Sequence, residues 1–353
     1  MKNSFGYSRY IPPRHFAMPG EWEKQQALLF SFPSNPQTWP DCRKELEKDY
    51  AVFAAAASRF QEVWLLVEEK EEMHAGDLLS SQDANMDNIK FFPIAHNDAW
   101  TRDHGPVTVR HKENGSIVFL NFRYNAWGGK FAPWDLDDAV VGKLSEHVGI
   151  PSLSVPFICE GGALECNGKG TLLTTESVIL NPNRNSGMTR SKAEFLFRKY
   201  LGVEKVLFLK SGLEGDDTDG HIDTLARFFS ENGVLAPLPG KNSPEYDVLA
   251  RNFRDLEKME TALGNALNVL PLPHPDTFHA PDSWRQEILP ATYANFVIVN
   301  GGVLVPTYGQ RKDEEAMEVI SSVFPGREVV GVDCSRIILE GGALHCLTQN
   351  IYS

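Results

Sequence analysis

The stretch "EGGALHCLTQN" (340–350), close to the end of the chain, repeats the stretch "EGGALECNGKG" (160–170). Of the seven positions in "EGGALEC" and "EGGALHC", six carry the same residue, and the exception is Glu165 against His345. A phrase that occurs twice in one chain indicates an internal structural repeat. How far the repeat extends therefore decides the fold class.

The repeat extends into hairpins, because four segments place two β-rich runs on either side of a glycine-containing turn. An Asn-Gly pair between alternating apolar runs is a strong hairpin signal. The four segments are "GPVTVRHKENGSIVFL" (105–120), "GGALECNGKGTLLTT" (161–175), "DTLARFFSENGVLAP" (223–237) and "NFVIVNGGVLVP" (295–306). A fifth hairpin is completed by pairing "GGALHCLTQ" (341–349) with "QALLFSFP" (26–33), which joins the two ends of the chain.

Between the hairpins the chain alternates a helix with a short apolar strand. Apolar residues at i, i+3 and i+4 predict helices over 41–60, 134–148, 189–201, 244–267 and 312–323. The strands that follow them are "EVWLLV" (62–67), "LSVPFI" (153–158), "EKVLFL" (204–209), "NVLPL" (268–272) and "REVVGV" (327–332). The pattern predicts an α/β fold of about five ββαβ units, and without a linker it forms one domain over 1–353.

Composition narrows the class of partner. The net charge of −13 disfavours nucleic acid and an anionic membrane surface, and it suits a small cationic substrate. The five cysteines are odd in number and form no CxxC pair, which favours a reducing cytoplasm over a disulfide framework or a zinc site. The start of the chain lacks the apolar segment of a signal peptide, and no run of about 18 apolar residues predicts a membrane span.

Polar residues collect just before or within the first strand of each hairpin. If the units surround an axis, equivalent positions meet there and form one central site. By unit, these residues are Asp98, Trp100, Arg102 and Asp103; Glu160; Asp216, Asp217, Asp219, His221 and Asp223; Asn295; and Glu340, His345 and Cys346.

This set suggests attack on a guanidinium group. A thiolate is a strong nucleophile, and a nearby histidine can carry a proton. Several buried carboxylates are costly unless a cation pairs with them. A planar guanidinium offers a fork of donors that matches two carboxylates, and its charge would also help to hold the cysteine as a thiolate.

Six motifs spread over the whole chain resemble those of agmatine deiminases and the related bacterial-type peptidylarginine deiminases, in the guanidino-group-modifying superfamily. They are "MPGEWE" (18–23), "NDAWTRDHGP" (97–106), "NAWGGK" (125–130), "GTLLTTESVILNPNRN" (170–185), "DDTDGHID" (216–223) and "GGALHCLTQN" (341–350). The resemblance implies a five-bladed α/β propeller (pentein fold), in agreement with the repeat count.

The resemblance also implies roles for individual residues. Cys346 matches the nucleophile that forms a covalent amidino intermediate, and His221 matches the general acid/base. Asp103 and Asp223 match the carboxylates that bind the guanidinium. The remaining expected substrate contacts are Asp217 at the distal amine, Trp100 as a wall of the cavity, and Asn295 and Trp127 on the substrate side. No metal or other cofactor is implied.

The expected reaction is hydrolysis of agmatine to N-carbamoylputrescine and ammonia, a step of putrescine and polyamine biosynthesis. "NAWGGK" and Asp217 resemble the agmatine branch, whereas "EGGALHC" stands where many agmatine deiminases have "GGGNIHC". One alternative is a peptidyl- or free-arginine deiminase that produces citrulline. A second is a non-catalytic propeller that binds a partner or a polyamine. The resemblance also implies that the protein could form a homodimer.

The other residues of the repeated phrase have structural interpretations. Cys166 is expected to be a buried apolar residue. Neighbouring strand residues point to opposite faces, so if Cys346 faces the cavity then His345 faces away from it. Glu160 and Glu340 could stabilise the tight Gly-Gly turns through hydrogen bonds to backbone amides.

Overall fold

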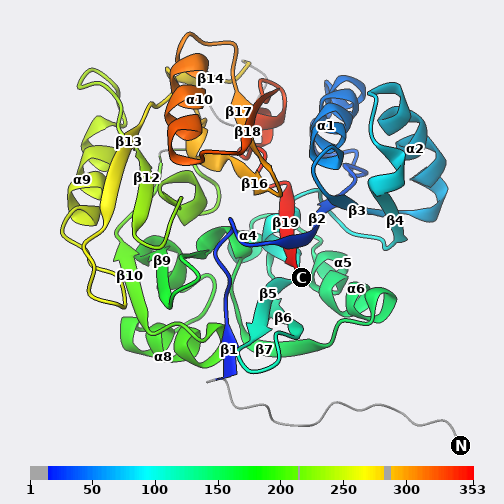
Figure 1. Ribbon diagram of the computed structural model, residues 1–353. Helices are drawn as coiled ribbons and strands as arrows, with labels where there is room; N and C mark the ends of the chain where they lie inside the picture. The colour runs from blue at the N-terminus through cyan, green and yellow to red at the C-terminus, as the bar shows by residue number, and fades with distance from the viewer. Residues whose placement is uncertain (1–14, 214, 282–287) are drawn as a thin grey trace, which may run out of the picture.

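The computed structural model describes residues 15–213, 215–281 and 288–353, and it is a mixed α/β structure (Figure 1). Five of its sheets, in the described ranges, share one strand pattern, in which a central strand has an antiparallel partner on one side and a parallel partner on the other. In Figure 1 these sheets and their helices lie around the middle of the molecule. The pattern is the predicted ββαβ unit without its helix.

The five sheets are defined by the following strands. They are β5 (Val107–His111), β6 (Ile117–Arg123) and β7 (Ser152–Ile158); β8 (Glu165–Cys166), β9 (Thr171–Thr175) and β10 (Lys205–Leu209); β11 (Arg227–Phe228), β12 (Gly233–Pro237) and β13 (Asn268–Leu272); β16 (Val297–Val299), β17 (Gly302–Thr307) and β18 (Glu328–Asp333); and β19 (Thr348–Tyr352), β2 (Gln25–Ser31) and β3 (Glu62–Val67).

The last sheet joins the two ends of the described chain. Strand β19 pairs antiparallel with β2, with Thr348 opposite Phe30 and Asn350 opposite Leu28. The predicted pairing of the two chain ends is therefore confirmed, although its two strands lie more than 300 residues apart in the sequence. The bounds of the predicted C-terminal strand are wrong, because residues 341–347 lie outside any strand and β19 spans 348–352. This pairing seats the segment that carries Cys346 beside the N-terminal part of the chain.

One helix precedes the parallel strand of each of these sheets. The helices are α1 (Arg43–Ser58), α6 (Val140–Val148), α8 (Arg190–Leu201), α9 (Tyr246–Leu256) and α10 (Lys312–Val323). Helix α1 shows why such segments are helical, because Leu46, Tyr50, Phe53 and Ala57 recur at helical spacing and are all buried. Its apolar face packs onto the largest hydrophobic core, which contains residues of both chain ends.

Two predicted helices are wrong in their extent. The helix expected over 244–267 ends at Leu256, because the chain then turns with Gly264 at a φ of +80° and forms a bridge between Glu260 and Ala266. The helix expected over 134–148 is divided into α5 (Asp135–Asp138) and α6. The sequence pattern also missed α2 (Glu72–Ser81) and β4 (Ile89–Pro93), and β4 extends the sheet by pairing with β3.

Remaining elements are short. They are β1 (Phe16–Ala17), β14 (Phe278–His279), β15 (Ile288–Leu289), α3 (Thr101–His104), α4 (Ala126–Gly129), α7 (Glu176–Ile179) and the 3₁₀ turns η2 (Glu69–Glu71), η3 (Met86–Asn88), η4 (Gly161–Ala163), η5 (Ile222–Thr224), η6 (Tyr293–Asn295) and η7 (Ile337–Glu340). All five cysteines lie in the described ranges and are free. None of the helices in those ranges combines the length and the apolar character that a membrane crossing requires.

The glycines that end α6 and α8 offer a matched test of packing. Gly149 and Gly202 both adopt left-handed conformations, with φ of +71° and +68°. A Cβ on Gly149 would meet nothing within 4 Å, whereas one on Gly202 would lie 1.8 Å from the carbonyl oxygen of Phe16.

We expect Gly149→Ala to lower the free energy of unfolding by about 1 kcal/mol, the cost of a left-handed alanine. Gly202→Ala should lower it by about 1–3 kcal/mol more, because the backbone at Phe16 must move as well. Urea unfolding of the two variants measures the difference. Equal losses would show that β1 is not packed against the end of α8.

Candidate active site

A cavity of about 300 Å³ opens beside Cys346. Its lining combines aromatic rings with acidic side chains. The aromatic residues are Trp100, Tyr124, Trp127 and Phe131, the acidic ones are Asp98, Asp103, Asp137, Asp217 and Glu340, and the cationic one among the described residues is Lys130. Such a lining attracts a small cation that carries apolar methylene groups.

Cys346 lies between η7 and β19, and its side chain is 6% exposed. Its thiol donates to Oδ2 of Asp223 at 3.7 Å, and the side-chain amide of Asn295 donates to Sγ at 3.3 Å. The backbone N–H of Cys346 donates in turn to Oδ1 of Asn295 at 3.3 Å. Burial, with the charges of Asp223 and Asp103, raises the pKa of the thiol well above its usual value. The cysteine is therefore a protonated thiol at neutral pH unless a cation enters.

Asp103 and Asp223 are both buried but are held differently. Asp103, in α3, accepts hydrogen bonds from the backbone of Gly162 at 3.0 Å and from Nε1 of Trp127 at 2.9 Å. Burial raises the pKa of Asp103 to about 6, although the nearby His221 lowers it. Asp223, in η5, accepts a hydrogen bond from His345 at 2.7 Å through Oδ2, while its Oδ1 is buried without a hydrogen-bond partner.

The charge state of Asp223 follows from its neighbours. Burial alone would raise its pKa, but the hydrogen bond and charge of His345 outweigh burial, and the pKa is lowered. Asp223 is therefore an ionised carboxylate with one unused oxygen. An unsatisfied buried carboxylate oxygen is costly, so this atom marks where a donor of a ligand is missing.

His221 is fully buried, and neither of its ring nitrogens has a hydrogen-bond partner. Nδ1 lies 3.6 Å from Oδ1 of Asp103 and Nε2 lies 3.9 Å from Oε2 of Glu160, which are ion-pair distances too long for hydrogen bonds. Burial alone would lower the pKa of His221, but Asp103 and Glu160 raise it to about 9. The imidazole therefore carries a proton at neutral pH.

Glu160 owes its position to Arg184 rather than to its own turn. The guanidinium of Arg184 donates from Nε to Oε1 of Glu160 at 2.8 Å and also binds Asp219. The expectation that Glu160 caps the Gly-Gly turn is wrong, because no backbone amide of that turn bonds its side chain. Glu340 accepts a hydrogen bond from the backbone N–H of Trp39 at 3.1 Å. Trp39 lies in a distant part of the sequence and not in the Gly-Gly turn.

The shared glycines of the repeated phrase make room for the site. A Cβ on Gly162 would lie 2.4 Å from Nδ1 of His221 and 2.8 Å from Oδ1 of Asp103. In the second copy, a Cβ on Gly342 would lie 2.4 Å from the ring of Trp100. The repeated glycines are thus places where site residues approach the backbone.

The loop that carries Trp127 is held in an unusual conformation. Ala126 and Trp127 have φ of +47° and +55°, which is uncommon for residues other than glycine. Asn125 holds the turn by accepting a hydrogen bond from Gly128 at 2.9 Å. Lys130 ties it to the next loop, donating to the carbonyl of Asp217 at 2.6 Å. Backbone strain of this kind often accompanies a functional position, and here it brings Nε1 of Trp127 to Asp103.

The eight predicted site residues fall into two groups. Cys346, Asp103, Trp100, Trp127 and Asp217 line the cavity. His221, Asp223 and Asn295 are buried just behind this lining, and both Asp223 and Asn295 contact Cys346. The sequence places Glu160 among the polar residues of the site and predicts a turn-stabilising role for it, but not its approach to His221. Nothing in the sequence singled out Asp137.

Among the described residues, one group outside the cavity could hold a metal ion. Ligand atoms of His15, His111 and Glu113 lie within 4.8 Å of one another on the surface. None of the three lines the cavity at Cys346. The absence of a metal from the reaction stays a prediction.

Comparison with known proteins places this geometry in a family. The model of the Porphyromonas-type peptidyl-arginine deiminases matches residues 17–351. The chain belongs to this family. It is 34% identical over 354 residues, covering 95% of both chains, to an agmatine deiminase of Pseudomonas syringae pv. syringae.

Solved structures of the deiminase family superpose on the chain. An agmatine deiminase of Enterococcus faecalis matches with a TM-score of 0.91 and 32% identity over 97% of this chain and 98% of its own. An agmatine deiminase of C. jejuni, in a cysteine-to-serine variant with substrate bound, matches with a TM-score of 0.86 and 32% identity over 96% of both chains. This chain is therefore a hydrolase of the deiminase type, acting on C–N bonds of a guanidino group.

We expect Glu160→Gln to lower the pKa of His221 from about 9 by about one pH unit, because a carboxylate 3.9 Å away loses its charge. The proton would then be lost at lower pH. Histidine resonances followed by NMR across a pH titration measure this. Glu69→Gln, at an exposed position, is the control and should leave the titration unchanged. An unchanged His221 titration in Glu160→Gln would assign the raised pKa to Asp103 alone.

Proposed function

We propose that the protein is an agmatine deiminase, which hydrolyses agmatine to N-carbamoylputrescine and ammonia. The observation that carries the proposal is the thiol of Cys346 placed 3.7 Å from the ionised Asp223 in an acidic cavity that also contains Asp103. The related agmatine deiminases over nearly the full chain support it. Cys346 is the nucleophile, and His221 is the general acid and base.

The fold proposed for this site is a five-bladed α/β propeller in a single catalytic domain over 1–353. Five sheets of one strand pattern support five blades, and the pairing of β19 with β2 supports closure of the ring. The N-terminal residues 1–14 lie outside the described ranges. A homodimer and a cytoplasmic location stay predictions.

The guanidinium binds between Asp103 and Asp223. Its N–H groups form a planar fork that can reach the unused Oδ1 of Asp223 and an oxygen of Asp103. The positive charge of the substrate adds to those of His345 and His221 beside the two buried carboxylates, and its N–H groups meet the Oδ1 of Asp223, which has no donor. The same charge lowers the pKa of Cys346, which Asp223 and Asp103 raise in the free protein. Substrate binding thereby promotes loss of the thiol proton to solvent.

The thiolate of Cys346 attacks the guanidinium carbon, and a C–S bond forms. The C–N bond to one terminal nitrogen breaks as His221 transfers its proton, and ammonia leaves. Neutral His221 then takes a proton from water, whose oxygen attacks the same carbon. The C–S bond breaks as the C=O double bond forms, and the hydroxyl proton passes to the departing sulfur, so N-carbamoylputrescine is released and Cys346 returns as a thiol. General acid–base catalysis of this kind typically contributes about 10²–10⁴-fold in rate.

The charges of the cavity favour agmatine over arginine. Arginine carries a carboxylate where agmatine has only hydrogen on the carbon beside its amine. Among the described lining residues the cation is Lys130, whose ammonium already donates to Asp217 and Asp219. A substrate carboxylate would face Asp98, Asp137 and Glu340. Asp217, in the wall beside Lys130, is proposed to receive the substrate amine.

We expect the purified protein to release ammonia from agmatine with a kcat/KM at least about 100-fold above the values for free arginine and for a peptide ending in arginine. The reason is that a substrate carboxylate left unpaired in this buried site destabilises the bound state by about 3 kcal/mol or more. Ammonia and product assays across pH 6–10 measure the three values. Comparable turnover of either arginine substrate would favour the arginine-deiminase alternative. No ammonia from any of the three would favour a binding protein.

Cys346→Ser should abolish turnover while the protein still binds agmatine, because the serine hydroxyl is a poor nucleophile in this site. Calorimetry measures the binding. Cys166→Ser is the matched control, at the equivalent position of the repeated phrase, and should keep activity. In the unmodified protein, rapid acid quenching with agmatine followed by mass spectrometry should place an amidino adduct on Cys346. Activity that survives Cys346→Ser would refute the thiolate mechanism.

A further inference from the structure

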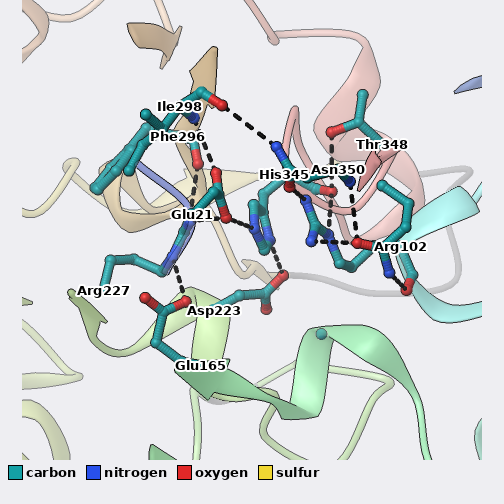
Figure 2. A network of polar contacts seen from close by, with 12 residues as sticks. Glu21, Arg102, Glu165, Asp223, Arg227, Phe296, Ile298, His345, Thr348 and Asn350 are labelled. Carbon is teal, nitrogen blue, oxygen red and sulfur yellow. Dashed lines mark hydrogen bonds and ion pairs between the residues drawn. The ribbon is translucent and has the colours of Figure 1, made fainter. Parts of the chain in front are cut away.

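The single difference between "EGGALEC" and "EGGALHC" leads to one buried polar network (Figure 2). Glu165 accepts from Nε of Arg227 at 2.9 Å through Oε2. His345 contacts Oε2 of Glu21 through Nε2 at 2.8 Å, and Glu21 accepts from Nη2 of Arg227 at 2.6 Å. Glu21 and Arg227 thus form a central pair. The first copy of the phrase supplies Glu165 to Arg227, and the second supplies His345 to Glu21. The proposed mechanism uses none of these four residues.

His345 connects this network to the proposed substrate site. Its Nδ1 lies 2.7 Å from Oδ2 of Asp223, opposite the contact of Nε2 with Glu21. Both carboxylates are ionised, since the pKa of Glu21 is lowered well below its usual range and that of Asp223 is lowered too. Burial opposes the shift in each case, and the outweighing partners are Arg227 and His345 for Glu21 and His345 for Asp223. A carboxylate only accepts, so both ring nitrogens of His345 must donate.

The orientation of His345 excludes a catalytic role. Its ring is 1% exposed, and both nitrogens are used by carboxylates. His345 and Cys346 lie in a turn before β19 rather than in a strand, so strand alternation does not apply to them, but His345 does face away from the cavity that Cys346 lines. What the ring can do is fix the plane of the Asp223 carboxylate, because a planar ring held at both ends allows one orientation.

The far end of the ring is itself rigidly held. Glu21 accepts a backbone hydrogen bond from Ile298 at 2.9 Å through its other oxygen. Arg227 is fully buried and donates to the carbonyl oxygens of Ala294 at 3.1 Å and Phe296 at 2.6 Å. A charge network with every donor satisfied is rigid, whereas one with a missing partner is costly.

We infer that His345 is a positioning residue, which holds Asp223 ionised with Oδ1 directed at the guanidinium of the substrate while Glu21 and Arg227 anchor the ring. The inference rests on the proposed function, since it specifies how that site prepares one of its two carboxylates. It also explains why position 345 carries a hydrogen-bond donor where position 165 carries an acceptor. Asp223 needs a donor, and Arg227 needs an acceptor.

The test measures agmatine binding without turnover, by calorimetry in Cys346→Ser protein. Adding His345→Gln should weaken binding by about tenfold to a hundredfold, the loss expected for a charge-assisted hydrogen bond that orients the acceptor. In protein that retains Cys346, kcat/KM should fall by at least that factor.

The matched control is Glu165→Gln, at the same position of the other copy and equally buried in the same network. It contacts Arg227 but not Asp223, so it should lower the melting temperature and leave agmatine binding within about twofold. If both changes weaken binding equally, the network is only structural and the inference is overturned. If His345→Gln binds as tightly as its parent, the inference is likewise overturned.

Glu21→Gln supplies a second variant in case His345→Gln does not fold. It keeps the contact of His345 with Asp223 but removes the anionic anchor, and should weaken binding by about threefold to tenfold. Unchanged binding in folded Glu21→Gln protein contradicts the inference. If the Cys346→Ser parent binds no agmatine and the unmodified protein releases no ammonia from it, the proposed function itself has failed, together with the inference that rests on it.

Discussion

The antiparallel pairing of β19 with β2 is the contact on which the site depends. It joins the two ends of the described chain and places the segment after Cys346 beside the strand that follows Glu21. Glu21 and His345, 324 residues apart in sequence, then meet at 2.8 Å. Long-range pairing of this kind carries the entropic cost of closing the long loop between the two strands. The site around Cys346 is therefore complete only when the two ends of the chain are paired.

Burying several carboxylates around one cavity has an electrostatic cost, and ion pairs in the free protein offset only part of it. Asp223 is neutralised by His345, and Glu160 by Arg184, whereas Asp103, Asp98 and Asp137 have burial-raised pKa values of about 6, 7 and 6. A cation entering the cavity relieves this unpaired charge. Sites that are destabilised before the ligand arrives commonly trade stability for affinity and catalysis. Burial, with the charges of Asp223 and Asp103, keeps Cys346 as a thiol in the free protein.

Much of the architecture could be predicted from the sequence, because hairpin turns and helical periodicity are local signals. The five strand pairs and the meeting of the chain ends followed from counting repeats. What could not be predicted were features decided by distant packing. The helix expected to Leu267 stops at Leu256, and Asp137 reaches the cavity from α5 without any motif. The positions of Asp103 and Cys346 were predicted from the motifs, but which oxygen of Asp223 is free depends on His345 and Glu21, from opposite ends of the chain.

The two copies of the repeated phrase show how one sequence pattern can carry different chemistry. Cys166 is buried, and its thiol donates to the carbonyl oxygen of Met18 at 3.4 Å. Burial, with the charges of Glu165 and Glu23, raises its pKa to about 12. Cys346 follows the same two glycines in sequence, but Gly341 adopts a left-handed φ of +87° after η7 whereas Gly161 begins η4, and the neighbours of Cys346 are Asp223 and Asn295. Reactivity thus depends less on the cysteine's own phrase than on what η5 and η6 present to it. Within a symmetric repeat, the partners supplied by the neighbouring units determine which copy becomes the site.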